Sequence, residues 1–156
     1  MKNEIEYLIL TLQSVYDGDP WFGRNMTNIL EEINATTALQ KPNNQHSILE
    51  LLYHIINWRE FTISRLMPDN EKPSSYFEAN DWGKYDHSDA MLWEKGILIL
   101  ESTQHRLVDL LANLREESLI VKVAERKYDV RYLLYGIIQH DIYHLGQIAY
   151  VKKLLE

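Results

Sequence analysis

The sequence of 156 residues contains no cysteine. This absence excludes disulfides, thiolate metal ligands and a cysteine nucleophile supplied by the chain itself. Basic residues are also sparse, since no block of lysine or arginine is longer than two residues and the formal net charge is −7. Because nucleic-acid binding needs a basic stripe or patch, we expect no nucleic-acid partner.

Long hydrophobic runs are missing as well, because no apolar stretch approaches the length of a membrane span. The N-terminal segment carries Glu4, Glu6 and Asp17 through its apolar residues and lacks the small-residue cleavage site of a signal peptide. We therefore expect a cytoplasmic protein with no membrane partner. The composition, 46% hydrophobic and 25% charged, is typical of a globular protein, and the length suits a single domain over residues 1–156.

Helical periodicity is the main pattern that the sequence does contain. The first amphipathic segment covers residues 3–16 and ends at the stop signal DGDP, and a shorter amphipathic piece follows at 26–33. A second long segment begins at Ser47, whose spacing from Glu50 is that of a capping box, and Pro68 closes it.

Two further segments complete the pattern. Ser88 is a candidate cap for a third helix over residues 89–114, and Asp129 is a candidate cap for a fourth that runs almost to the C-terminus. Residues 119–123, LIVKV, are expected to form an extended connector. Four long amphipathic segments in a chain of this size predict an all-α fold, namely a four-helix bundle.

The polar stretch at 67–89 is longer than a plain connection between the second and third bundle helices requires. It is rich in proline, serine, aspartate, asparagine and glycine. Long loops of this kind often form lids or binding sites. Because the loop carries Trp82 and Tyr85, whose rings are able to cover a small substrate, we expect it to form part of a pocket wall.

Two histidines stand four residues apart in the last helix, within QHDIYHLGQ at 139–147. Since successive helical residues rotate by about 100°, His144 falls on the same apolar stripe as Asp141, and His140 lies beside it. This spacing lets two imidazoles reach a single ion. His54 flanks the apolar stripe of the second helix, so a bundle that packs the second and fourth helices together can supply a third nitrogen.

Other interpretations compete with a metal site. A histidine beside a helix core is often only a hydrogen-bonded polar residue, and we interpret His46, His87 and His105 as surface residues. A di-iron bundle needs two E-x-x-H pairs, whereas the pairs that start at Glu50 and Glu101 are one residue too long. The segment HDIYH resembles the zincin motif HExxH, but aspartate replaces glutamate and no third ligand follows downstream.

Three parts of the sequence form a recognisable combination. They are the ending YLLYGIIQHDIYHLGQIAYVKK, the segment HSILELLYHIINWREFTISRL in the second helix, and the spaced tryptophans Trp21, Trp82 and Trp93. Together they resemble the DinB/YfiT-like family of helical-bundle metalloproteins, from about Trp21 to Lys153. The resemblance implies a four-helix bundle that holds one divalent metal ion, often nickel or zinc, and implies that its ligands are His54, His140 and His144.

The resemblance also implies an enzyme that acts on a small-molecule substrate. Related proteins are described as metal-dependent hydrolases or as transferases that activate a low-molecular-weight thiol. Within this interpretation Asp141 is a candidate catalytic base or a residue that orients a ligand, and Trp58 and Gln147 are candidate pocket residues.

A non-catalytic interpretation remains as the alternative. In it the chain is a stress-related metal- or ligand-binding protein whose site is closed by a fourth protein ligand, such as His87 or an aspartate from the 67–89 loop. The family resemblance and the number of aromatic residues further predict a homodimer.

Overall fold

The computed structural model describes residues 3–67, 69 and 72–156, and in these it contains helices and no strand. The four long helices are α1 (Glu4–Tyr16), α4 (Ile48–Leu66), α6 (Met91–Ala112) and α7 (Val130–Leu155). The shorter ones are α2 (Met26–Leu30), α3 (Ala35–Leu39), α5 (Ser74–Ala79) and the 3₁₀ helix η2 (Glu116–Ile120). The predicted all-α fold is confirmed.

Side-chain caps fix where the long helices begin. Ser47 and Glu50 form the predicted capping box at the start of α4, because the Ser47 hydroxyl accepts from Glu50 N and the Glu50 carboxylate accepts from Ser47 N. The Asp129 side chain accepts from Tyr132 N at the start of α7, as predicted. These bonds satisfy backbone N–H groups that have no partner within the helix itself.

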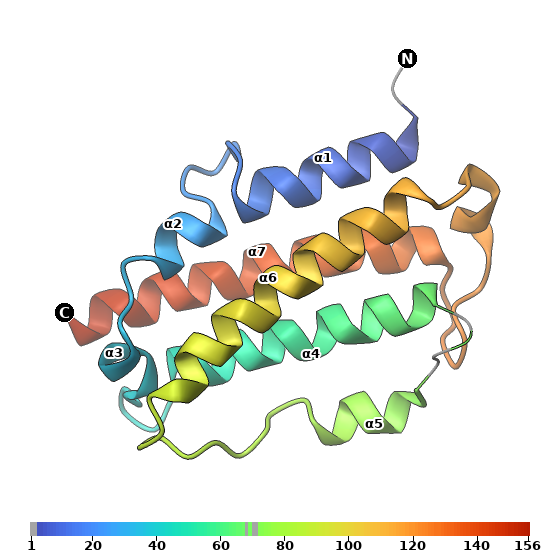
Figure 1. Cartoon of the computed structure of the whole chain (residues 1–156). Helices are drawn as coiled ribbons and strands as arrows, with labels where there is room; N and C mark the ends of the chain where they lie inside the picture. The colour runs from blue at the N-terminus through green and yellow to red at the C-terminus, as the bar shows by residue number, and fades with distance from the viewer. Residues whose placement is uncertain (1–2, 68, 70–71) are drawn as a thin grey trace.

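The long helices pack as a bundle in which α4 contacts both α6 and α7, and α1 contacts the same two helices. Figure 1 shows that α1 and α7 run in one direction while α4 and α6 run in the other. Since α4 and α6 are parallel, the chain between them has to return along the whole bundle. That distance is about 28 Å for the 19 residues of α4.

This return explains the length of the polar stretch at 67–89, and it contains more structure than a loop. Helix α5 forms within it and packs against α4. Pro68, the predicted end of the second helix, lies outside the described residues, and α4 ends at Leu66. The return path (residues 80–90) runs alongside α4 in Figure 1, and its residues Asp81 and Trp82 contact Trp58 and His54 of that helix.

Two local predictions are wrong. Ser88 does not cap α6, because its N–H and hydroxyl both donate to Asp86 Oδ1, and α6 begins only at Met91 with no side-chain cap. Residues 119–123 are not an extended connector throughout, since Leu119 and Ile120 belong to the helix η2. A single β-bridge between Lys122 and Asp129 follows it.

The interior divides into two apolar clusters. One cluster includes Ile48, Leu52, Leu145 and Ile148, and the other includes Leu8, Phe61, Leu133 and Leu134. Polar residues are also buried along α4 and α7, including His54, Arg59, Asp141 and His144. Among the described residues, no helix is long and apolar enough to cross a membrane.

Candidate metal centre

The packing of α4 against α7 brings three histidines together. His54 Nε2 lies 3.0 Å from His144 Nε2 and 3.0 Å from His140 Nε2. One ligand atom from each ring lies within 4.8 Å of the other two. We call these residues the histidine cluster. The sequence placed the three residues on facing helices, and the structure joins them at one point.

The spacing of the three nitrogens fits a single metal ion. Zinc–nitrogen bonds of about 2.0–2.1 Å, with angles between roughly 90° and 109°, hold two ligand nitrogens about 2.8–3.4 Å apart. The two separations of 3.0 Å fall within that range, and all three ligand atoms lie within 4.8 Å of one another. The three rings are therefore close enough to hold one ion.

The outer nitrogens of two rings define which tautomer is present. His54 Nδ1 donates to the backbone oxygen of Asp81 over 3.1 Å, and His144 Nδ1 donates to Gln147 Oε1 over 2.6 Å. Because both partners are acceptors, the proton of each neutral ring sits on Nδ1 and the lone pair sits on Nε2. The two Nε2 lone pairs thus point toward one another, an arrangement that a cation between them stabilises.

Burial keeps these two rings neutral. Desolvation, and after it the nearby His140, lower the pKa of His144 to about 4. Desolvation also lowers the pKa of His54, against the opposing effect of its hydrogen bond to Asp81. Neutral imidazole is the form that binds metal ions, so the donor set fits a divalent cation at neutral pH.

The cluster has three protein ligands and no fourth among the described residues. His87, the candidate fourth ligand from the loop, is used elsewhere. Its Nε2 lies 3.3 Å from Ser47 Oγ and 3.6 Å from Glu50 Oε1. Three histidines without a fourth protein ligand leave room for water or another small molecule on the ion.

The return path between α4 and α6 covers one side of the cluster. The Trp82 ring stacks between two imidazoles, 4.0 Å from that of His54 and 3.7 Å from that of His46. Asp81 Oδ1 lies 3.0 Å from His54 Nδ1. The loop therefore orients the His54 ring. His46 is exposed, as predicted, and it also takes part in this stack.

The two candidate pocket residues lie on opposite sides of the cluster. Gln147 orients His144 through the bond to Nδ1. Trp58 donates its indole N–H to Asp81 Oδ1 over 2.6 Å, and its ring lies 6.5 Å from that of His140. Trp58 and His140 line a cavity of about 150 Å³, while His144 and Gln147 line a separate one of about 430 Å³.

Asp141, the candidate catalytic residue, is completely buried and forms an ion pair with Arg59. Arg59 Nε donates to Asp141 Oδ2 over 3.0 Å, and Arg59 Nη1 donates to Gln104 Oε1 and Thr103 Oγ1. We call these four residues the arginine cluster. The other carboxylate oxygen, Oδ1, lies 4.0 Å from His140 Nδ1, and neither atom has a hydrogen-bond partner among the described residues.

Sequence reasoning missed Arg59, although a signal for it exists. Arg59 follows Leu52 and Ile55 at helical spacing on the buried stripe of α4, where a charge requires a partner. Asp141 occupies the equivalent stripe of α7. Opposite charges at core positions of two packed helices predict a buried ion pair. Asp81 and Trp82 could not have been placed in this way, because their position depends on the path of the return segment.

Comparison with known proteins gives a family and nothing closer. No curated protein and no solved structure matches the chain. The model of the DinB superfamily matches residues 21–148, which include all three members of the histidine cluster. The match covers most of the sequence and agrees with the helical bundle described above, so this chain belongs to the DinB superfamily.

Proposed function

We propose that the chain is a metal-dependent enzyme that binds one divalent ion, nickel or zinc, through His54, His140 and His144. The observation that carries the proposal is the direction of the ring nitrogens. Acceptors hold the Nδ1 protons of His54 and His144 outside the cluster, so that the Nε2 lone pairs converge inside it. Hydrogen bonds from the outer nitrogen of a ligand histidine are typical of functional metal sites.

The reaction we propose is attack of a water or a small thiol on a small electrophilic substrate. A divalent ion bound by neutral imidazoles lowers the pKa of a coordinated water or thiol and so supplies the nucleophile at neutral pH. The chain needs no cysteine of its own for either nucleophile. The products are those of a hydrolase or of a thiol S-transferase.

The surroundings of the cluster support an open site. The arrangement of three histidines without a fourth described ligand is that of catalytic centres, whereas structural zinc is normally held by four. Two cavities adjoin the cluster, one beside His140 and one beside His144. We assign Asp141 the role of positioning His140. Arg59 donates to one of its carboxylate oxygens, and the other oxygen lies 4.0 Å from His140 Nδ1.

A substrate screen tests this function. Protein loaded with nickel or zinc is assayed against esters, amides and electrophilic halides, each with and without a small thiol such as cysteamine. His144→Ala is the inactive control, and His105→Ala, which changes an exposed histidine on α6, is the matched control for the substitution itself. We expect turnover by the wild type and by His105→Ala alone.

The thiol dependence separates the two candidate reactions. Turnover without thiol indicates a hydrolase, and turnover only with thiol indicates a transferase. If the wild type and His144→Ala give equal rates on every substrate, the enzyme proposal is not supported. A metal-loaded structure with a fourth protein ligand would favour the non-catalytic binding protein instead.

A further inference from the structure

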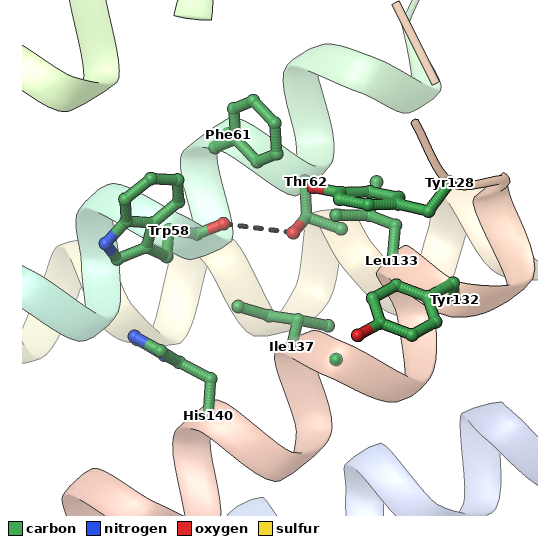
Figure 2. A pocket seen from close by; sticks show the side chains of 9 residues that line it. Trp58, Phe61, Thr62, Tyr128, Tyr132, Leu133, Ile137 and His140 are labelled. Atoms are coloured by element: carbon green, nitrogen blue, oxygen red, sulfur yellow. Dashed lines mark hydrogen bonds between the residues drawn. The ribbon is translucent and has the colours of Figure 1, made fainter. Parts of the chain in front are cut away.

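The cavity beside His140 lies between α4 and α7 and has a volume of about 150 Å³ (Figure 2). Its walls are aromatic and aliphatic side chains, and none of its nine lining residues is an aspartate, glutamate, lysine or arginine. His140 belongs both to this lining and to the histidine cluster. The apolar cavity thus directly adjoins one ligand of the proposed metal ion.

Two of the polar groups at its edge, on Thr62 and Trp58, are already engaged. Thr62 donates its hydroxyl proton to the backbone oxygen of Trp58 over 3.0 Å. The indole N–H of Trp58 donates to Asp81, and Figure 2 shows this nitrogen on the side of the ring away from Tyr132. A molecule in the cavity therefore meets mainly carbon atoms, which favours an uncharged, apolar group.

Ring packing holds the Trp58 side of the wall in place, while Tyr132 keeps 66% of its surface exposed. Trp58 packs edge-to-face on Phe61, with the ring centroids 5.4 Å apart. At the other end the rings of Tyr128 and Tyr132 lie 5.0 Å apart. Preformed walls reduce the entropy lost on binding. An apolar cavity of about 150 Å³ in another protein holds one benzene molecule, so a single six-membered ring suits this volume.

Exposure indicates the direction from which a substrate approaches the cluster. The His140 side chain keeps 25% of its surface exposed, whereas that of His54 keeps 7%. Trp82 covers the His54 ring by stacking. Among the three ligands His140 is thus the accessible one, and it is the one that faces the apolar cavity.

We propose that this cavity is the subsite for the apolar part of the substrate, and that this part is one six-membered ring or a branched alkyl group of the same size. The inference rests on the proposed function, because it places the reactive group of the substrate over the histidine cluster. It adds a substrate class, namely small uncharged molecules with a single ring next to the electrophilic or thiol group.

Gly136 offers a way to close the cavity. It lines the cavity within α7, and a Cβ built on it meets no atom within 4 Å. Gly136→Leu therefore fills the space without displacing the backbone, and it replaces a weak helix former with a strong one. Gly146 on the same helix is the matched control, since its Cβ also meets nothing within 4 Å and it lines a different cavity.

The first measurement uses metal-free protein and fluorobenzene, followed by ¹⁹F NMR. We expect saturable binding in the millimolar range by the wild type and by Gly146→Leu, and binding weaker by at least about tenfold by Gly136→Leu. The melting temperatures of both variants should equal or exceed that of the wild type, which excludes misfolding. Equal binding by Gly136→Leu and the wild type would overturn the proposal.

The second measurement links the cavity to the metal. Cobalt-loaded protein is titrated with benzyl mercaptan and with ethanethiol, and thiolate coordination is followed by its charge-transfer absorption. We expect the wild type to prefer benzyl mercaptan by about tenfold or more, and Gly136→Leu to lose this preference. If the wild type and Gly136→Leu prefer benzyl mercaptan over ethanethiol to the same extent, the subsite assignment is overturned. If fluorobenzene binds but cobalt does not, the metal proposal fails and the subsite assignment fails with it, although the cavity still selects a ring.

Discussion

Two buried polar clusters lie next to each other on α4 and α7, and they differ in the charges of the groups that they bring together. The arginine cluster joins a cation to an anion, with the guanidinium of Arg59 also donating to Gln104 and Thr103. In the histidine cluster the Nε2 lone pairs of His54 and His144 face each other at 3.0 Å, and His140 Nε2 also lies 3.0 Å from His54 Nε2. The first cluster contains its own cation, Arg59, whereas the second is built of imidazoles alone.

This difference supports a structural role for the arginine cluster and, under the proposed function, a metal-binding role for the histidine cluster. A buried ion pair with further hydrogen bonds specifies how helices pack, and it requires no ligand. Lone pairs that converge at hydrogen-bond distance become favourable when a metal ion lies between them. His140 and Asp141 are adjacent in sequence, so one turn of α7 contributes to both clusters.

The largest expected effect comes from breaking the arginine cluster. Arg59→Met leaves the Asp141 carboxylate buried without its cation, and such a loss typically lowers the free energy of unfolding by about 3–5 kcal/mol. Urea denaturation of the metal-free protein measures this change. Arg106→Met is the matched control, because Arg106 pairs with Glu60 at the surface. The control should change the free energy by less than about 1 kcal/mol. Equal effects of the two substitutions would contradict a structural role for Arg59.

Removing a ligand from the histidine cluster should mainly lower the affinity for metal ions. His140→Ala and His144→Ala each leave two nitrogens, so we expect the affinity for zinc or nickel to fall well beyond the roughly 10–100-fold that the loss of an outer partner costs. Competition with a chelating dye measures the affinity. The His105→Ala variant should bind as the wild type does. A variant without His144 that keeps full affinity would remove this residue from the site.

Sequence reasoning succeeded where a local rule determines the structure. The capping box at Ser47 and Glu50, the cap at Asp129 and the extents of the long helices all follow from neighbouring residues. The histidine cluster could be predicted because helical spacing and the family resemblance both indicated His54, His140 and His144.

It failed where the result depends on contacts between distant residues. Arg59 and Asp141 are 82 positions apart and meet only because α4 packs on α7. The stack of His46, Trp82 and His54 likewise depends on the return of the chain along α4. Ser88 was assigned as a cap although Asp86 competes for its hydrogen bonds. Local patterns do not determine whether Ser88 caps the following helix or donates to Asp86 in a turn.

The metal-free histidine cluster should also respond to acid. The pKa of His144 falls from 6.5 to about 4 on folding, so between these values the unfolded chain binds a proton that the native protein does not. The contribution of His144 to the free energy of unfolding is therefore fully present above pH 6.5 and is lost as the pH falls toward 4. The loss amounts to about 3 kcal/mol at 1.36 kcal/mol for each pKa unit. Urea denaturation of metal-free wild type and His144→Ala across this range measures it, and identical pH profiles would contradict the prediction.

The smallest expected effect concerns the partner that orients His144. Gln147→Leu removes the acceptor for His144 Nδ1, and we expect metal affinity to fall about 10–100-fold. Gln147→Glu keeps an acceptor oxygen and should retain most of the affinity. If both variants lose affinity equally, steric effects account for the loss, and the hydrogen bond does not.

The contrast between a cluster with its own cation and a cluster proposed to bind a metal ion is tested most directly by counting metal ions. Untagged wild-type protein is purified, loaded separately with nickel, zinc and manganese, freed of excess ion and measured by elemental analysis. The histidine cluster predicts one divalent ion per chain for at least one of these metals, and less than a tenth of that in a variant with His54, His140 and His144 all replaced by alanine. A wild type that retains no ion after any loading, or a triple variant that retains as much as the wild type, would contradict the account.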